Sequence, residues 1–152
     1  MDKIDKKIIN LLQADASLPL QVLAEKVQLS TTPCWRRIQQ LEAQGVITQR
    51  VALIDAAKVN LGVTVFVSVK AASHSKAWYE QFSSVVKAIP EVLDFYRLSG
   101  DVDYLLRIVV PDIQAFDRIY KHLVSQVELR DVSSSFAMEK LKSTTILPLD
   151  YI

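Results

Sequence analysis

Several features are scarce in this 152-residue chain, and each shortage excludes a class of protein. The single cysteine excludes an intrachain disulfide and a cysteine-rich zinc site, so a reducing cytoplasm is the expected location. No apolar run approaches the roughly 20 residues of a membrane-spanning helix. The charged N-terminus also lacks the apolar core and cleavage site of a signal peptide. We therefore expect a cytoplasmic protein without a membrane partner.

The formal net charge is also small, only +1, so charge by itself neither indicates nor excludes a polyanionic partner. Hydrophobic residues, in contrast, make up 50% of the chain, which is enough for a packed core and excludes global disorder. The residue pattern changes along the chain from a helical period to strands. We expect a helical domain over residues 1–47, a linking strand and connection over 48–62, and a second domain over 63–152.

The first part of the chain predicts three short helices, over residues 2–15, 20–27 and 31–44. Asp2 and Asp5 begin the first helix at the spacing of a capping box. Only residues 28–30 separate the second helix from the third. Two helices joined by so short a turn, with another packed behind them, are typical of a helix-turn-helix unit.

The third of these helices has clear start and stop signals. Ser30 is a good N-cap, Pro33 is tolerated in the first turn, and Gly45 can adopt the positive φ that ends a helix. At 100° per residue, one face of the helix is apolar and consists of Cys34, Ile38 and Leu41. This position predicts that the thiol of Cys34 is a buried small hydrophobe rather than a redox sensor.

The other face of the same helix carries small polar, amide and guanidinium groups. Arginine pairs with guanine edges and glutamine with adenine edges, so this face suits a DNA major groove; the alternative is a solvated polar face. We expect Arg37, on the flank, to meet phosphate, and Trp35 either to enter the groove or to pack against the first helix. The predicted DNA-contacting residues are Thr32, Trp35, Arg36, Arg37 and Gln40.

After an extended segment over residues 46–54, which could pair with its counterpart in a second copy, strands and helices alternate. The predicted strands cover residues 63–71, 92–98, 104–110 and 132–141, and the predicted helices cover 76–89 and 112–127. The order βαββαβ within about 80 residues is that of a ferredoxin-like sandwich. The fold class is therefore α+β, with an N-terminal helix-turn-helix domain.

The turn at residues 100–104 has two interpretations. It is a hairpin loop in which glycine supplies backbone freedom and the aspartates supply turn hydrogen bonds. It is also suited to the zwitterion of a free amino acid, because exposed backbone N–H groups hold a carboxylate and Asp101 or Asp103 receives an ammonium group.

Residues that would support catalysis or metal binding are isolated. His74 and His122 have no partner at metal-ligand spacing. The chain has no nucleophile with a matching base, no glycine-rich phosphate loop and no HExxH-type motif. We expect neither an enzyme nor a resident metal or cofactor.

Four motifs cover both halves of the chain: DKIDKKIINLL (2–12), PCWRRIQQLEAQGVI (33–47), SGDVDYLLRIVVPD (99–112) and DVSSSFAMEKLKSTTILPL (131–149). Through these motifs the chain resembles the leucine-responsive regulatory protein/asparagine regulator (Lrp/AsnC) family of transcription regulators. TTPCW together with SSFAME is similar to regulators of cysteine catabolism. One departure is Gln28, which stands in the helix-turn-helix turn where the family commonly has glycine.

The resemblance implies a sequence-specific regulator of double-stranded DNA whose oligomeric state or DNA affinity responds to a free amino acid, with cysteine, leucine and methionine as candidates. It implies homodimers that assemble further, often to octamers, with the effector held beside the 100–104 turn between dimers. The effector-binding residues expected on this basis are Gly100, Asp101, Val102, Asp103, Tyr104, Ser134, Ser135 and Phe136. The alternatives are a ferredoxin-like enzyme or carrier with an appended helical domain, and an oligomeric scaffold.

Overall fold

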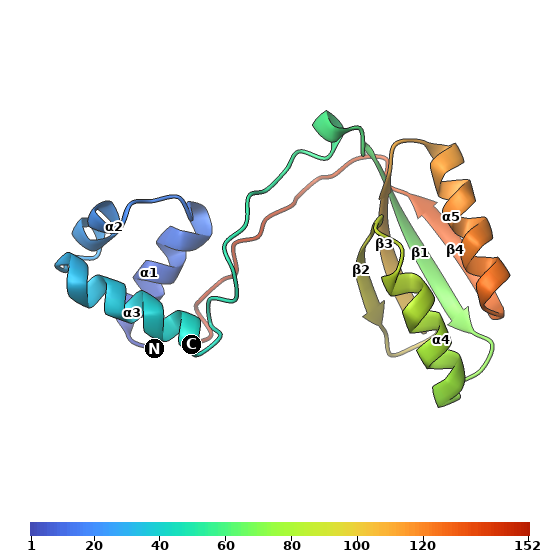
Figure 1. Ribbon diagram of the computed structural model, residues 1–152, viewed down its shortest axis with the longest axis horizontal. Coiled ribbons are helices and arrows are strands. Elements are labelled where there is room, and N and C mark those ends of the chain that lie inside the picture. Colours follow the sequence, from blue (N-terminus) through green and yellow to red (C-terminus); the bar gives the residue numbers. More distant parts are fainter. The chain divides into compact units, whose positions relative to one another are not determined.

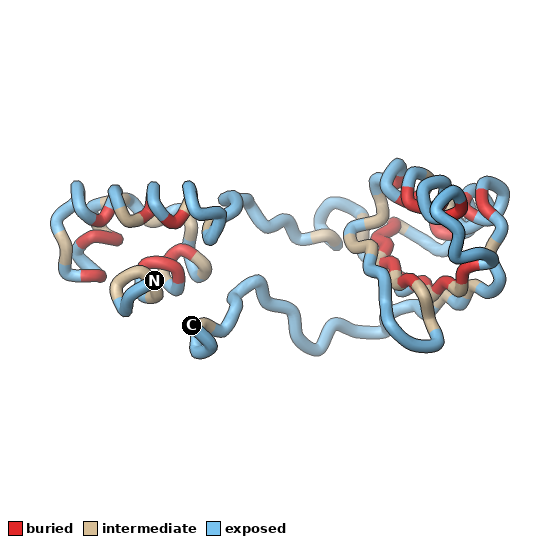
Figure 2. Tube along the Cα trace, turned by 90° about the horizontal axis from the view of Figure 1, so that it is seen from below, coloured by how far each residue is buried: buried red, intermediate tan, exposed pale blue.

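The computed structural model describes residues 1–152 and divides into two compact units. The helical unit comprises Met1–Leu53 together with Lys142–Ile152, and the sheet unit comprises Ile54–Leu141. Buried residues gather separately in each unit (Figure 2), so each has its own hydrophobic core. No helix is both long enough and apolar enough to cross a membrane.

The helical unit contains α1 (Lys3–Ala14), α2 (Leu20–Lys26) and α3 (Thr31–Ala43). At the start of α1 the side chain of Asp2 accepts hydrogen bonds from the amides of Ile4 and Asp5, and the side chain of Asp5 accepts one from the amide of Asp2. This is the capping box that the sequence predicts, and it satisfies amides that have no partner within the helix.

The turn between α2 and α3 has a strained backbone at Gln28, whose φ is 60°. A side chain in this left-handed region costs roughly 1 kcal/mol, which explains why glycine suits the position. Ser30 occupies the N-cap of α3 as predicted, but its side chain makes no cap hydrogen bond. The helix ends before Gly45, whose φ of 71° also confirms the predicted stop.

The core of the helical unit lies between its three helices. Ile8 of α1, Leu23 of α2 and Cys34 of α3 are each at most 1% exposed. Cys34 is thus the buried hydrophobe that the helical period predicts, and its neighbours on that face, Ile38 and Leu41, are buried too. Full burial of a large apolar side chain contributes about 1.5–3 kcal/mol, so this small unit depends on a few such contacts.

The sheet unit has the predicted βαββαβ order. Its elements are β1 (Val63–Ala71), α4 (Lys76–Lys87), β2 (Val92–Arg97), β3 (Tyr104–Val110), α5 (Ile113–Gln126) and β4 (Leu129–Phe136). The strands pair antiparallel in the order β2-β3-β1-β4. Both helices lie on one face of the sheet (Figure 1), which gives the ferredoxin-like sandwich expected from the sequence.

Alternation along β1 explains how the sheet covers its core. Val65, Val67 and Val69 are at most 1% exposed and point toward the helices, where Phe82 of α4 is also fully buried. Phe66 lies between them in sequence, points to the opposite face and is 38% exposed. The sheet therefore has one covered face and one open face.

Three segments differ from the sequence prediction. The last strand spans Leu129–Phe136 rather than 132–141, because its antiparallel partner β1 begins at Val63. The final hydrogen bond joins the amide of Ala137 to the carbonyl of Thr64. Residues 46–54 form no strand within the single chain, and the predicted pairing of this segment with its counterpart in a second copy stays a prediction. Residues 142–152 belong to the helical unit, not to the sheet unit, because Leu149 packs against the helical core.

Candidate nucleic-acid interface and effector site

The solvent-facing surface of α3 carries a stripe formed by Thr32, Arg36 and Gln40. All three are exposed, and none has a side-chain hydrogen bond or ion pair within the chain. Their spacing of four residues places them along one face over roughly 12 Å. The donors and acceptors of this stripe are therefore free within the chain, and their pairing with base edges stays a prediction.

Trp35 lies at the edge of this stripe. Its side chain is 51% exposed, and it lines a shallow hollow in the helical unit together with Leu12 of α1 and Leu20 of α2. The sequence predicts two alternative roles for Trp35. Its place in the lining of this hollow agrees with packing beside α1, and its entry into a DNA groove stays a prediction.

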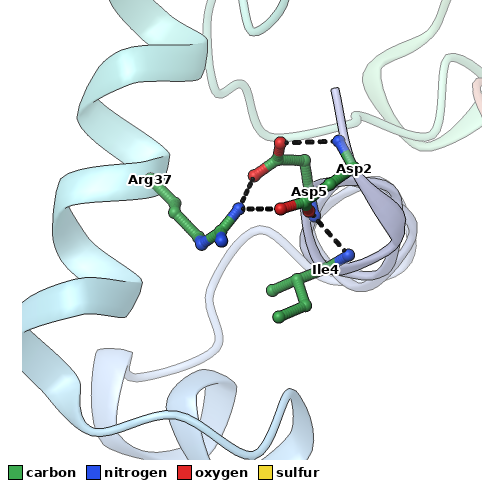
Figure 3. A network of polar contacts seen from close by, with 4 residues as sticks. All are labelled: Asp2, Ile4, Asp5 and Arg37. Atoms are coloured by element: carbon green, nitrogen blue, oxygen red, sulfur yellow. Dashed lines mark hydrogen bonds and ion pairs between the residues drawn. The ribbon is translucent and has the colours of Figure 1, made fainter.

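Arg37 already has partners inside the helical unit. Its Nη1 donates to Oδ2 of Asp2 and to Oδ1 of Asp5, each at 2.7 Å, so the recognition-helix candidate α3 is tied to the start of α1 (Figure 3). The phosphate contact predicted for Arg37 stays a prediction. In the chain as it stands, the guanidinium orients α3 rather than pointing freely to solvent.

The same network shifts the ionisation of its members. The pKa of Asp2 is lowered, first by the hydrogen bond from the amide of Asp5 and then by the guanidinium of Arg37. The pKa of Arg37 is raised by its hydrogen bonds to Asp5 and Asp2. This link was not predicted from the sequence, although the sequence contains two signals for it: the carboxylates of the capping box, and an arginine on the flank of the third helix.

The turn between β2 and β3 is firmly bonded to the end of β1. Gly100 has a φ of 123°, which only glycine adopts readily. The amide of Asp103 donates to the carbonyl of Val69 at 3.1 Å, and Oδ2 of Asp103 accepts from the amide of Ala71 at 2.8 Å. The carboxylate of Asp103 is therefore already used to hold the turn.

Asp101 is the accessible carboxylate of this turn, with a side chain that is 89% exposed. Its Oδ2 lies 2.7 Å from Nζ of Lys70, and this hydrogen bond is the main cause of its lowered pKa. Arg130 contributes further positive charge. Within one chain, the ammonium group of Lys70 thus occupies the position expected for the ammonium of a ligand.

The two other predicted effector residues of this turn differ in how far they are buried. The ring of Tyr104 is 5% exposed and packs among Trp78 and Phe82, and burial raises its pKa. The side chain of Val102, in contrast, is half-buried on the turn.

The three β4 candidates lie on different faces of the sheet. Phe136 points to the helix side, where its ring meets Phe116 at 5.4 Å in a T-shaped pair, and Ser134 points the same way. Ser135 lies opposite Phe66, on the open face. The alternation of side chains along a strand makes this separation unavoidable.

Register also separates these β4 candidates from the turn. Phe136 pairs with Val65, whereas Tyr104, which follows the turn, pairs with Val69. Four residues of a strand span roughly 13 Å. The register instead places Lys70 and its partner Asp131 nearest the turn, and no sequence motif marks either residue as an effector contact.

Each of the two units matches the sequence model of a known domain family. The sequence model of the winged helix-turn-helix DNA-binding family matches residues 1–48, and that of the Lrp/AsnC ligand binding domain matches residues 64–147. An AsnC family transcriptional regulator from Agrobacterium tumefaciens is 61% identical, with a TM-score of 0.96, over 100% of this chain and 99% of that one.

Two further proteins are similar over nearly their full length. DecR, a DNA-binding transcriptional activator of Escherichia coli strain K12, is 51% identical, with 99% of each chain covered. A transcriptional regulator of Neisseria meningitidis, solved as a complex with L-methionine, is 39% identical, with a TM-score of 0.95, over 99% of this chain and 98% of that one.

Proposed function

Because the chain belongs to the Lrp/AsnC family of DNA-binding transcription regulators, we propose that α3 reads specific DNA sequences under the control of a free amino acid. The observation that carries this proposal is the stripe of Thr32, Arg36 and Gln40, which is exposed and unpaired on the second helix of a helix-turn-helix. The enzyme or carrier that the sequence left open gains no support, since the relatives compared are transcription regulators.

DNA recognition follows from the chemistry of this stripe. Arg36 can make two hydrogen bonds to a guanine, and Gln40 two to an adenine one helical turn further along α3. Each such pair contributes about 1–3 kcal/mol of discrimination against the wrong base. In a dimer, two copies of α3 would read half-sites separated by one turn of DNA, ~34 Å.

The amino-acid effector is proposed from the turn at residues 100–104. Exposed backbone amides there could bind the carboxylate of an amino acid. Asp101 could bind the ammonium group of the same ligand once its ion pair with Lys70 is broken. Since Ser135 and the turn lie apart in one chain, a site that uses both would need more than one copy. The complex of the Neisseria meningitidis relative with L-methionine makes methionine a reasonable first probe, with cysteine and leucine as further candidates.

Assembly is proposed from the open face of the sheet. Phe66 is 38% exposed on this face, beside an ion pair between Arg107 and Asp94. Two such faces packed together would make a dimer, and dimers would assemble further, with an octamer as the expected end point. An effector bound between dimers could shift this assembly only by its difference in affinity for the two states.

The test of DNA reading is a footprinting and anisotropy experiment on the DNA upstream of the protein's own gene. We expect protected half-sites, and binding that weakens as salt rises, because phosphate contacts release counterions. Binding that is equal on scrambled DNA of the same length would refute the proposal. A thermal-shift screen of the twenty amino acids tests the sensing part, since a ligand that prefers the native state must raise the melting temperature.

A further inference from the structure

The C-terminal segment, residues 142–152, gives the chain a second connection between its units. It follows β4 without an intervening helix or strand and ends in the helical unit. The first connection is the segment that follows α3 and leads to β1. The strand that carries Ser134 and Phe136 is therefore joined directly to the unit that carries α3.

The attachment point is Gln13, in the last turn of α1, which holds the backbone of Leu147 at two points. Nε2 of Gln13 donates to the carbonyl of Leu147 at 3.2 Å, and Oε1 of Gln13 accepts from the amide of Leu147 at 2.7 Å. A side-chain amide has both a donor and an acceptor, so it can replace the partner residue of an antiparallel ladder.

The local sequence prepares the segment for this contact. Pro148 restricts the residue before it to an extended backbone, which presents both polar groups of Leu147 to one partner. The next residue, Leu149, packs against the core of the helical unit, whereas Leu147 is 68% exposed and Ile152 is 53% exposed. The contact thus combines backbone capture with one apolar anchor.

We propose that residues 146–149 form a strap that ties β4 to α1 and restrains the helical unit for simultaneous binding of two DNA half-sites. This inference rests on the proposed function, in which a dimer reads paired half-sites. A unit held by two segments has less orientational freedom to lose on binding than a unit held by one. The second half-site is then engaged at a higher effective concentration.

The test compares the full-length variant Gln13→Leu with the wild type. The control is Asn10→Leu, which removes an exposed amide from α1 that has no bond to the strap. We expect hydrogen exchange of the Leu147 amide to become about tenfold faster in Gln13→Leu, because its acceptor is lost. We also expect roughly three- to tenfold weaker binding to a footprinted duplex with two half-sites.

Binding to the same duplex with one half-site scrambled should stay unchanged in Gln13→Leu, and Asn10→Leu should match the wild type on both duplexes. Leu149→Asp, which removes the apolar anchor, should reproduce the effects of Gln13→Leu. These results together would support the strap.

Unchanged exchange of the Leu147 amide in both strap variants would overturn the proposal. An equal loss of affinity for the two-site duplex and the one-site duplex would overturn it as well, since this would indicate general damage to the DNA-binding surface. If the Leu147 amide exchanges faster in a strap variant but the affinity for the two-site duplex stays the same, the strap does not restrain the helical unit for DNA binding. A wild type that does not prefer two half-sites would instead refute the proposed dimeric function, and the exchange rate would still decide whether the segment docks.

Discussion

Arg37→Met should loosen α3 from the start of α1, because it removes both ion pairs while it keeps most of the aliphatic length of the side chain. Nη1 of Arg37 lies 2.7 Å from a carboxylate oxygen of Asp5 and from one of Asp2. The side chains of Arg37 and Asp5 are 31% and 17% exposed, so solvent screens this pair only in part. Exposed pairs contribute about 0.2–1 kcal/mol, and we expect the Arg37–Asp5 coupling to lie near the upper end because both side chains are only partly exposed.

The assay is a double-mutant cycle on Arg37→Met and Asp5→Asn, read by hydrogen exchange of the buried α1 amides of Ile8 and Leu12. These amides report on opening of the helical unit alone. The control is Arg36→Met, which makes the same chemical change at a position without an ion pair. We expect a coupling energy of roughly 1 kcal/mol that shrinks in 1 M salt.

A coupling energy below about 0.2 kcal/mol would refute the role assigned to Arg37, since exposed ion pairs typically give at least that much in double-mutant cycles. The role of Arg37 would also be refuted if Arg36→Met destabilised α1 as strongly as Arg37→Met does. In either case the short distances in Figure 3 would reflect proximity without stabilisation.

Three further predictions concern the helical unit. Gln28→Gly should raise its free energy of unfolding by about 0.5–1 kcal/mol, because φ is 60° there; a loss of stability in urea denaturation would contradict this. The lowered pKa of Asp2 stabilises the fold above its unfolded pKa of about 3.9, so stability should fall as pH drops further, and Asp2→Asn should flatten that fall. Burial raises the pKa of Cys34, so iodoacetamide should label it only after unfolding; rapid labelling of the native protein would contradict its burial.

The sequence alone predicted features that depend on local periods and local hydrogen bonds. The capping box at Asp2, the burial of Cys34 and the order of the strands and helices all follow from spacings within a few residues. The positive φ at Gln28 also agrees with the glycine that the family resemblance implies at that position.

Features that depend on packing between distant segments could not be predicted. The pair of Arg37 with Asp2 requires the position of α3 against α1, and the register of β4 on β1 separates Ser135 from the 100–104 turn. The sequence predicts residues 146–149 as part of the second domain, because one apolar residue, Leu149, forms no periodic pattern that would indicate contact with the helical core. Sequence spacing gives no distance between such segments.

The DNA selectivity of the Arg36→Ala variant tests most directly whether α3 reads base edges. The measurement is the ratio of dissociation constants for the footprinted upstream duplex and a scrambled duplex, at fixed salt, with the assembly size followed by light scattering. Loss of one two-bond contact to guanine predicts a selectivity ratio lower by about 5- to 150-fold, at an unchanged assembly size. An Arg36→Ala variant that keeps the wild-type selectivity would contradict the reading of base edges by α3.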